Sequence, residues 1–177
     1  GAPLVSGVEL GRSVIPVINI ADISTTTTVA TLDGAPFTSG TTVAAEGSHT
    51  LAVTVTDAAG WPTTVPPITF VIDKTAPVVR VLESGQPLVS GTKFNRGVLP
   101  QIEVTDNTAT TIAAKLGDAT YVPDTLIETE GALTLSIIVT DRGGNITTVP
   151  PITFLIDRTP PVVTITESGQ PFTSGSA

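Results

Sequence analysis

The octapeptide TTVPPITF at Thr63–Phe70 occurs again, unchanged, at Thr147–Phe154, which lies 84 residues further along the chain. The same offset carries Pro3–Gly7 (PLVSG) onto the identical Pro87–Gly91, and a related copy, PFTSG, follows at Pro171–Gly175. A fixed offset without insertion or deletion indicates tandem duplication of one unit. Other positions that keep their residue type at this offset are Arg12/Arg96, Pro16/Pro100, Asp22/Asp106, Asp57/Asp141 and Asp73/Asp157.

The length of the unit indicates what kind of repeat it is. Solenoid repeats span roughly 20 to 45 residues, which is much shorter than this unit. An independent β-sandwich needs roughly 100 residues, which is close to it. We therefore expect each unit to fold as a separate module and the chain to be a linear array of such modules.

Two prolines mark where the modules should meet. Ile72–Pro77 and Ile156–Pro161 each place proline after a strand-like run, where it ends strand pairing because it has no N–H to donate. Divided there, the first module lacks the counterpart of the strand expected at Val78–Glu83. The expected division is a first module at 1–75, a complete second module at 76–158 and the first strand of a third at 159–177.

The apolar pattern predicts strands and not helices. Apolar residues alternate with small or polar ones, the period of two that a half-buried strand requires. Threonine and valine, which favour strands, dominate these runs. The alternating positions include Leu51, Val53, Val55, Ile18, Ile20, Ile68 and Phe70, with their copies Leu135, Ile137, Val139, Ile102, Val104, Ile152 and Phe154. We predict an all-β fold of tandem immunoglobulin-like β-sandwich modules, each a Greek key of about seven strands in two antiparallel sheets.

Composition and charge exclude several functions. The chain carries 16 acidic and 8 basic residues, a formal net charge of −8, which opposes binding to the phosphates of a nucleic acid. No apolar run approaches the roughly 20 residues that span a bilayer, so no membrane insertion is expected. There is no cysteine, and each module must therefore be held by its apolar core without disulfides.

The residues do not indicate an enzyme. A catalytic site needs an acid, base or nucleophile held near a partner. His49 is the only histidine, and its copy in the second unit is Leu133. A position that tolerates leucine in the duplicate is better explained as a strand residue than as a catalyst.

Beyond these residue patterns, the order of the short motifs resembles a known family. The run from Glu46 to Gly60, its copy from Glu130 to Asn145, and the strand-and-linker runs Phe70–Pro77 and Phe154–Pro161 resemble the bacterial Ig-like repeats of large surface proteins. The resemblance implies an extracellular or bacterial cell-surface location. It also implies a structural spacer or stalk segment, with neighbouring Ig-like modules of the same chain as partners, and an adhesin as the parent protein.

Two alternatives to the spacer stay open. The first is a protein- or glycan-binding module that uses Trp61, the single tryptophan, which stands where the copy has Asn145. We favour packing of Trp61 against a neighbouring module, because an aromatic fraction of 4% is low for a platform of stacked rings. The second alternative is an accessory domain of a secreted hydrolase.

The sequence raises the question of whether the chain binds calcium as a cofactor. Three pairs of aspartates recur at predicted strand ends, and calcium prefers six to eight oxygen ligands, mostly carboxylates and carbonyls. An aspartate in the hairpin turn of one module could meet an aspartate in the linker of the same or the next module. The competing explanation is that these residues only hydrogen-bond their own turns. Some giant adhesins of the resembled kind use calcium at such junctions. The predicted metal ligands are Asp57, Asp73, Asp141 and Asp157.

The division of the repeat also predicts self-association. The first module should have an unpaired sheet edge, and an exposed edge invites pairing with another chain. The segment Val162–Glu167 is the third copy of the missing strand. We expect that this segment of a neighbouring chain can fill the edge and give a head-to-tail assembly.

Overall fold

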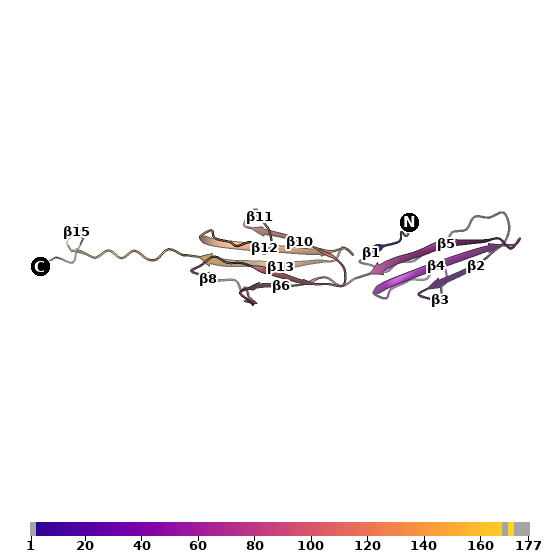
Figure 1. Cartoon of the computed structure of the whole chain (residues 1–177), viewed down its shortest axis with the longest axis horizontal. Helices are drawn as coiled ribbons and strands as arrows, with labels where there is room; N and C mark the ends of the chain where they lie inside the picture. The colour runs from indigo at the N-terminus through magenta and orange to yellow at the C-terminus, as the bar shows by residue number, and fades with distance from the viewer. Residues whose placement is uncertain (1–2, 168–169, 172–177) are drawn as a thin grey trace.

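The computed structural model describes residues 3–167 and 170–171, and within them the regular structure consists of strands. Two modules lie end to end along the long axis, and a tail extends beyond the second module (Figure 1). We call residues 3–75 the first module and residues 76–158 the second. In the described part of the chain, no helix is long and apolar enough to cross a membrane.

The second module is a sandwich of two sheets. Its larger sheet has the strand order β11-β10-β12-β13-β8, and its smaller sheet has the order β7-β6-β9. The buried residues of both sheets, among them Val81, Leu135, Ile137 and Phe154, pack into one core. This confirms the predicted all-β, immunoglobulin-like fold. The strands are β6 (Val78–Glu83), β7 (Gln86–Pro87), β8 (Thr92–Phe94), β9 (Gln101–Thr105), β10 (Thr110–Leu116), β11 (Ala119–Tyr121), β12 (Gly131–Asp141) and β13 (Ile146–Ile156).

The first module repeats the larger sheet. Its strand order β1-β5-β4-β2-β3 matches that of the second module strand for strand. Leu51, Val53, Phe70 and Ile72 from its two long strands are buried in a separate core. The strands are β1 (Val8–Leu10), β2 (Thr26–Leu32), β3 (Ala35–Pro36), β4 (Gly47–Asp57) and β5 (Pro62–Ile72).

The expectation of two sheets in each module is wrong for the first module. Residues 17–21, the counterparts of β9 and expected as a strand through Ile18 and Ile20, form no strand. In the second module β9 pairs with β6, and the first module has no counterpart of β6 among the described residues. Without that neighbour, the backbone N–H and C=O groups of 17–21 have no ladder to join.

The prediction of antiparallel pairing is also wrong at one place in each module. β1 pairs parallel with β5, and β8 pairs parallel with β13. Each short strand lies at the edge of the larger sheet and runs in the same direction as the last strand of its module. Parallel neighbours need a long crossover connection between them, and in each module a long stretch of chain separates the short strand from its partner.

The repeated octapeptide makes a bulge in the longest hairpin of each module. The register of β4 and β5 shifts between Leu51 and Val53, opposite Pro66 and Pro67. Pro150 and Pro151 produce the same shift between β12 and β13. Proline cannot donate to the ladder, so two adjacent prolines in a sheet are accommodated as a bulge.

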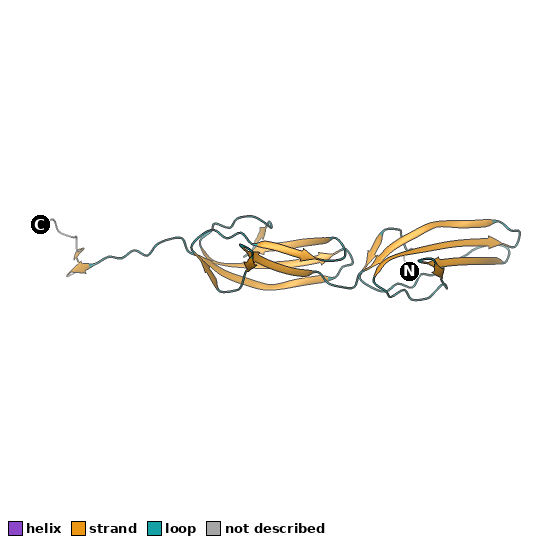
Figure 2. Cartoon of the chain, turned by 60° about the horizontal axis from the view of Figure 1, so that its bottom comes forward, coloured by secondary structure: helices purple, strands orange, loops and turns teal. Residues whose placement is uncertain are grey.

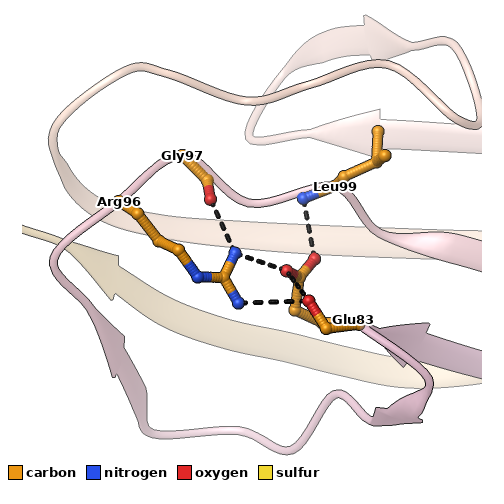
Figure 3. A network of polar contacts seen from close by, with 5 residues as sticks. Glu83, Arg96, Gly97 and Leu99 are labelled. Carbon is orange, nitrogen blue, oxygen red and sulfur yellow. Dashed lines mark hydrogen bonds and ion pairs between the residues drawn. The ribbon is translucent and has the colours of Figure 1, made fainter.

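A buried glutamate closes one end of the second module (Figure 3). Glu83, the last residue of β6, is 6% exposed. One carboxylate oxygen accepts a hydrogen bond from the Arg96 guanidinium at 2.6 Å, and the other accepts from the Leu99 backbone N–H at 2.7 Å. The guanidinium also lies over the Phe94 ring. The network therefore joins β6 to the segment that leads into β9.

The tail beyond the second module is extended (Figure 2). Val162, Val163 and Ile165 are 91%, 81% and 69% exposed. The last described strands are β14 (Thr166–Glu167) and β15 (Gln170–Pro171), which pair with the register that β6 and β7 have in the second module. The rest of the predicted third unit, after Pro171, lies outside the described residues.

Candidate cation site at the module junction

The junction forms where the linker after β5 meets the hairpin between β12 and β13. The Gly11 N–H donates to the Gly143 carbonyl at 2.9 Å, and the Asn145 side-chain amide donates to the Asp73 carbonyl at 2.7 Å. The Arg142 guanidinium lies 3.3 Å from the carboxylate of Glu9. Within the second module, the Thr147 hydroxyl donates a hydrogen bond to the Pro77 carbonyl next to the linker. The modules are thus joined by direct polar contacts in addition to the peptide chain.

Two glycines allow this close approach. A Cβ atom on Gly11 would lie 2.6 Å from the Gly143 carbonyl oxygen, and one on Gly143 would lie 2.8 Å from the Asp73 carbonyl oxygen. Both distances are shorter than van der Waals contact, and the neighbouring atoms are backbone. The repeat counterparts of these glycines are Asn95 and Ala59, so the close contact is particular to this junction.

Three carboxylates converge beside these contacts. Asp73 follows β5, Asp106 follows β9, and Asp141 ends β12. One carboxylate oxygen of each lies within 4.8 Å of the others. Asp73 and Asp141 are 2% and 5% exposed. Two modules therefore contribute buried negative charge to one place, which is costly unless a positive charge lies among the carboxylates.

The hydrogen bonds of the cluster leave one buried oxygen without a partner. Asp106 accepts from the Thr108 N–H at 2.8 Å, and Asp141 accepts from the Asn145 backbone and side-chain N–H groups at 2.8 and 2.7 Å. Asp73 Oδ1 accepts from the Thr75 N–H at 3.2 Å, whereas its Oδ2 is buried and unpaired. Within residues 3–167, no lysine, arginine or histidine forms an ion pair with any of the three aspartates.

The donor chemistry of this cluster suits a hard divalent cation. All the converging ligand atoms are carboxylate oxygens, which calcium and magnesium prefer, and there is no sulfur or imidazole to select a softer metal. A neighbouring hollow is lined by Glu9, Asp73 and residues 107–109. Glu9 Oε2 is also buried and unpaired, which makes Glu9 a fourth carboxylate at the junction. Water would supply the remaining ligands that calcium needs.

The structure brings together only part of the predicted ligand set. Asp73 and Asp141 meet at the junction, while Asp57 lies at the far end of the first module and Asp157 at the far end of the second. There Asp57 accepts from the Ala59 and Trp61 N–H groups, each at 2.9 Å, and Asp157 accepts from the Thr159 N–H at 3.2 Å. Asp73 and Asp141 make the equivalent turn contacts, so the metal-ligand role of Asp57 and Asp157 stays a prediction.

Asp106 and Glu9 were not among the predicted ligands. Asp106 did carry a signal, because it is one of the recurring aspartates at predicted strand ends. Glu9 carried none, because its copy is Lys93.

Trp61 lies in the hairpin turn between β4 and β5, at the end of the first module that faces away from the second (Figure 1). It is 76% exposed. The second module is therefore not the neighbour against which Trp61 was expected to pack. Packing against another module and ligand binding both stay predictions for this residue.

The buried His49 forms a polar pair with the exposed Asp33. Its Nδ1 lies 2.8 Å from a carboxylate oxygen of Asp33, and its Nε2 lies 3.0 Å from the Ala45 carbonyl oxygen. Both ring nitrogens face acceptors, so the imidazolium satisfies both. Burial lowers the pKa of His49, but the hydrogen bonds to Asp33 and Ala45 outweigh burial and leave the pKa raised. The counterparts Gly117 and Leu133 lack the pair altogether, which favours a structural role.

The first module should therefore be more stable at pH 5.5 than at pH 8.5. Because the folded-state pKa of His49 is raised above the unfolded value of about 6.5, its stabilisation is complete below that value and is lost as the pH rises through the folded pKa. Urea unfolding followed by NMR signals of β4 and β5 measures the effect, with β12 and β13 as internal control. His49→Leu should remove the difference; a difference that persisted in this variant would contradict the assignment.

Comparisons with known proteins identify the family. The family model described as "Bacterial Ig-like domain (group 3)" matches residues 36–119, and a second, described as "Bacterial Ig-like domain", matches residues 89–158. Together they cover more than half of the chain, which thus belongs to the bacterial Ig-like domains. Such domains are typical of extracellular and surface proteins and are generally non-catalytic. A search of curated protein sequences found no match.

The solved structures that match this chain include three of low sequence identity. The fibronectin(III)-like modules of Clostridium thermocellum CbhA match with 12% identity and a TM-score of 0.42, covering 86% of this chain and 90% of theirs. Bacteroides ovatus SGBP-B, solved with a mixed-linkage heptasaccharide, matches with 18% identity and a TM-score of 0.34, covering 85% and 43%. Drosophila N-cadherin EC1-3 matches with 13% identity and a TM-score of 0.34, covering 85% and 63%.

Proposed function

We propose that this chain is a spacer segment of a large, repetitive bacterial cell-surface or secreted protein, an adhesin in the first instance. The observation that carries the proposal is the polar junction, in which the Gly11–Gly143 and Asn145–Asp73 hydrogen bonds fix one module on the next. A module that only needed to fold would not require two glycines at its contact with a neighbour. A spacer does require them, because its role depends on a fixed orientation between neighbouring modules.

A divalent cation is proposed to hold the junction in this arrangement. Asp73, Asp106 and Asp141 would bind it, with Glu9 beside them. The unpaired Asp73 Oδ2 supports this, because a buried carboxylate oxygen without a partner costs stability that a bound cation would restore. The cation would thereby link the end of the first module to two strand ends of the second.

Small-angle scattering of the chain with calcium and then with chelator tests both proposals. We expect an elongated particle in both conditions, with a narrower range of shapes and a higher thermal midpoint in calcium. A cation present at 100 times its dissociation constant would stabilise the folded chain by about 2.7 kcal/mol. A compact particle would overturn the spacer, and an elongated particle indifferent to calcium and to magnesium would overturn the cation site alone.

A matched pair of variants locates the effect. Asp106→Asn removes one negative ligand but keeps an oxygen that can accept from Thr108, and it should weaken the response to calcium. Asp22→Asn changes the repeat counterpart at the outer end of the first module and should leave the response unchanged. Equal responses in the two variants would place the cation elsewhere.

A further inference from the structure

A three-residue segment before β4 holds the linker that leads to the second module. Residues 44–46, which we call the pre-β4 segment, belong to no strand. The backbone N–H of Lys74 donates to a carboxylate oxygen of Glu46, and the Lys74 ammonium donates to the Ala44 carbonyl at 2.7 Å. The Thr75 hydroxyl lies 3.2 Å from both carboxylate oxygens of Glu46. The course of the linker therefore depends on where the pre-β4 segment lies.

His49 holds the pre-β4 segment in turn. Its Nε2 atom lies 3.0 Å from the Ala45 carbonyl oxygen, and its Nδ1 atom lies 2.8 Å from a carboxylate oxygen of Asp33. His49 is 7% exposed and packs against the Phe70 ring, with 5.3 Å between the ring centroids. The other oxygen of Asp33 accepts from the Thr50 N–H at 2.7 Å. One buried ring thus connects a fixed carboxylate to the middle residue of the pre-β4 segment.

The protonation state of His49 decides whether both contacts can exist together. An imidazolium has two N–H groups and can donate to Asp33 and to Ala45, whereas a neutral imidazole has only one N–H. The remaining proton stays on Nδ1, because a hydrogen bond to a carboxylate is stronger than one to a neutral carbonyl. The lone pair of Nε2 then faces the Ala45 carbonyl oxygen, and the two repel each other. Loss of one proton therefore releases the pre-β4 segment.

His49 is the only histidine of the chain, and histidine is the side chain that ordinarily titrates near neutral pH. β2 and β5, which flank β4, carry no titratable side chain. Burial lowers the pKa of His49 and its two hydrogen bonds raise it by more, so the protonated form persists above the ordinary value of about 6.5. The charged groups around the ring and the pre-β4 segment are Asp33, Glu46, Lys74 and, across the hollow from Glu46, Glu9 of β1.

The second module has the same linker contacts without the histidine. The backbone N–H and the guanidinium of Arg158 donate to residues 128–130, at 3.1 and 2.9 Å. Leu133 and Gly117 stand at the repeat positions of the histidine and its aspartate. The hold on the linker is therefore common to both modules, and the contact that depends on protonation is particular to the first.

We propose that His49 is a pH-sensitive switch for the junction, in which the protonated ring keeps the pre-β4 segment on the linker and the neutral ring releases it. The linker begins with Asp73, whose carbonyl accepts from the Asn145 amide of the second module, so freedom at Lys74 reaches the contact between the modules. The junction is therefore stiffer in mildly acidic than in alkaline solution. This inference rests on the proposed spacer function, whose regulation it names, and it needs no bound cation.

An NMR titration of the isotope-labelled chain from pH 5.5 to pH 8.5, with chelator present, tests the switch. The chemical shift of the Lys74 amide should change with the same midpoint as the His49 ring. Its exchange with water, corrected for the intrinsic effect of pH, should increase about fivefold, as expected for the loss of one hydrogen bond. The Arg158 amide should do neither, and relaxation rates should show the two modules tumbling more independently at pH 8.5. A Lys74 amide that does not respond, or equal tumbling at both pH values, would overturn the proposal.

Two variants separate the switch from a general effect of pH. Asp33→Asn removes the charge that keeps the proton on Nδ1, while its amide can donate to Nδ1 and its oxygen can accept from Thr50. Neutral His49 can then donate from Nε2 to Ala45, so the ring should titrate at lower pH and the Lys74 amide should no longer follow it. His49→Leu, which installs the residue of the second module, should remove the response altogether. A Lys74 response that persisted in either variant would contradict the mechanism.

The switch and the spacer fail separately. Scattering at a single pH decides whether the chain is elongated, and the titration of the Lys74 amide is a local measurement that does not depend on that result. An elongated chain whose Lys74 amide is indifferent to pH would overturn the switch alone. A compact particle would overturn the spacer whatever the amide does.

Discussion

Glu83→Ala is expected to lower the free energy of unfolding of the second module by about 3 kcal/mol. Glu83 is buried, and its removal leaves the Leu99 N–H without an acceptor and the Arg96 guanidinium without its carboxylate. It also opens the end of the core between β6 and the segment before β9. Amide hydrogen exchange of β12 and β13 in the full chain measures the loss, because these central strands exchange through unfolding of the module.

A second substitution separates the two parts of this network. Glu83→Gln keeps a side-chain oxygen for the Leu99 N–H and loses only the charge opposite Arg96, which is half exposed at 51%. An ion pair with one exposed partner contributes less than a buried hydrogen bond left unmade, so the glutamine variant should lose less than half as much. Equal losses in the two variants would show that the ion pair dominates, contrary to this expectation. Exchange in β4 and β5 should not change in either.

Gly143→Val is expected to separate the two modules without unfolding either of them. A Cβ at this position would lie 2.8 Å from the Asp73 carbonyl, so the hairpin must withdraw and the hydrogen bonds at Gly11 and Asp73 must break. The Gly11 amide should lose its protection from hydrogen exchange. Scattering should show a broader range of shapes, and the response to calcium should disappear because Asp141 withdraws with the hairpin.

The repeat provides the control for this substitution. Ala59→Val changes the counterpart of Gly143 at the outer end of the first module, where the position already carries a side chain. It should leave the Gly11 amide protected and the shape unchanged. If Gly143→Val also left that amide protected, the close contact would not be what holds the modules together.

The sequence was sufficient to predict the long strands β4, β5, β12 and β13. The apolar residues Leu51 and Val53 occupy alternate positions, in the same phase as their copies Leu135 and Ile137. Each strand therefore has one apolar face, and that face must be the buried one. The parallel pairing of β1 and β8 was missed because the period of two is the same for both directions of pairing. The strand expected around Ile18 is absent for a different reason. A strand forms only where a partner strand is present, and a local sequence pattern does not show whether there is one.

The candidate site was predictable in part for similar reasons. The proximity of Asp73 and Asp141 could be inferred from the sequence, because a linker and a hairpin turn at the same end of a module must lie close together. Asp106 could not be ranked above the other recurring aspartates, because sequence does not say which strand ends share an edge. Glu9 reaches the junction through the parallel pairing of β1, which the alternation pattern does not reveal.

The glycine contact has a consequence for the order of modules in a longer array. Asn95 and Ala59 stand at the counterparts of Gly11 and Gly143, and a side chain at either position excludes the separation seen at this junction. A junction made with either of those positions must therefore join its modules at a different distance and angle. Exchanging two modules would change the path of the whole array even if every module kept its fold. The order of the repeats thus carries information about shape that the fold of a single repeat does not contain.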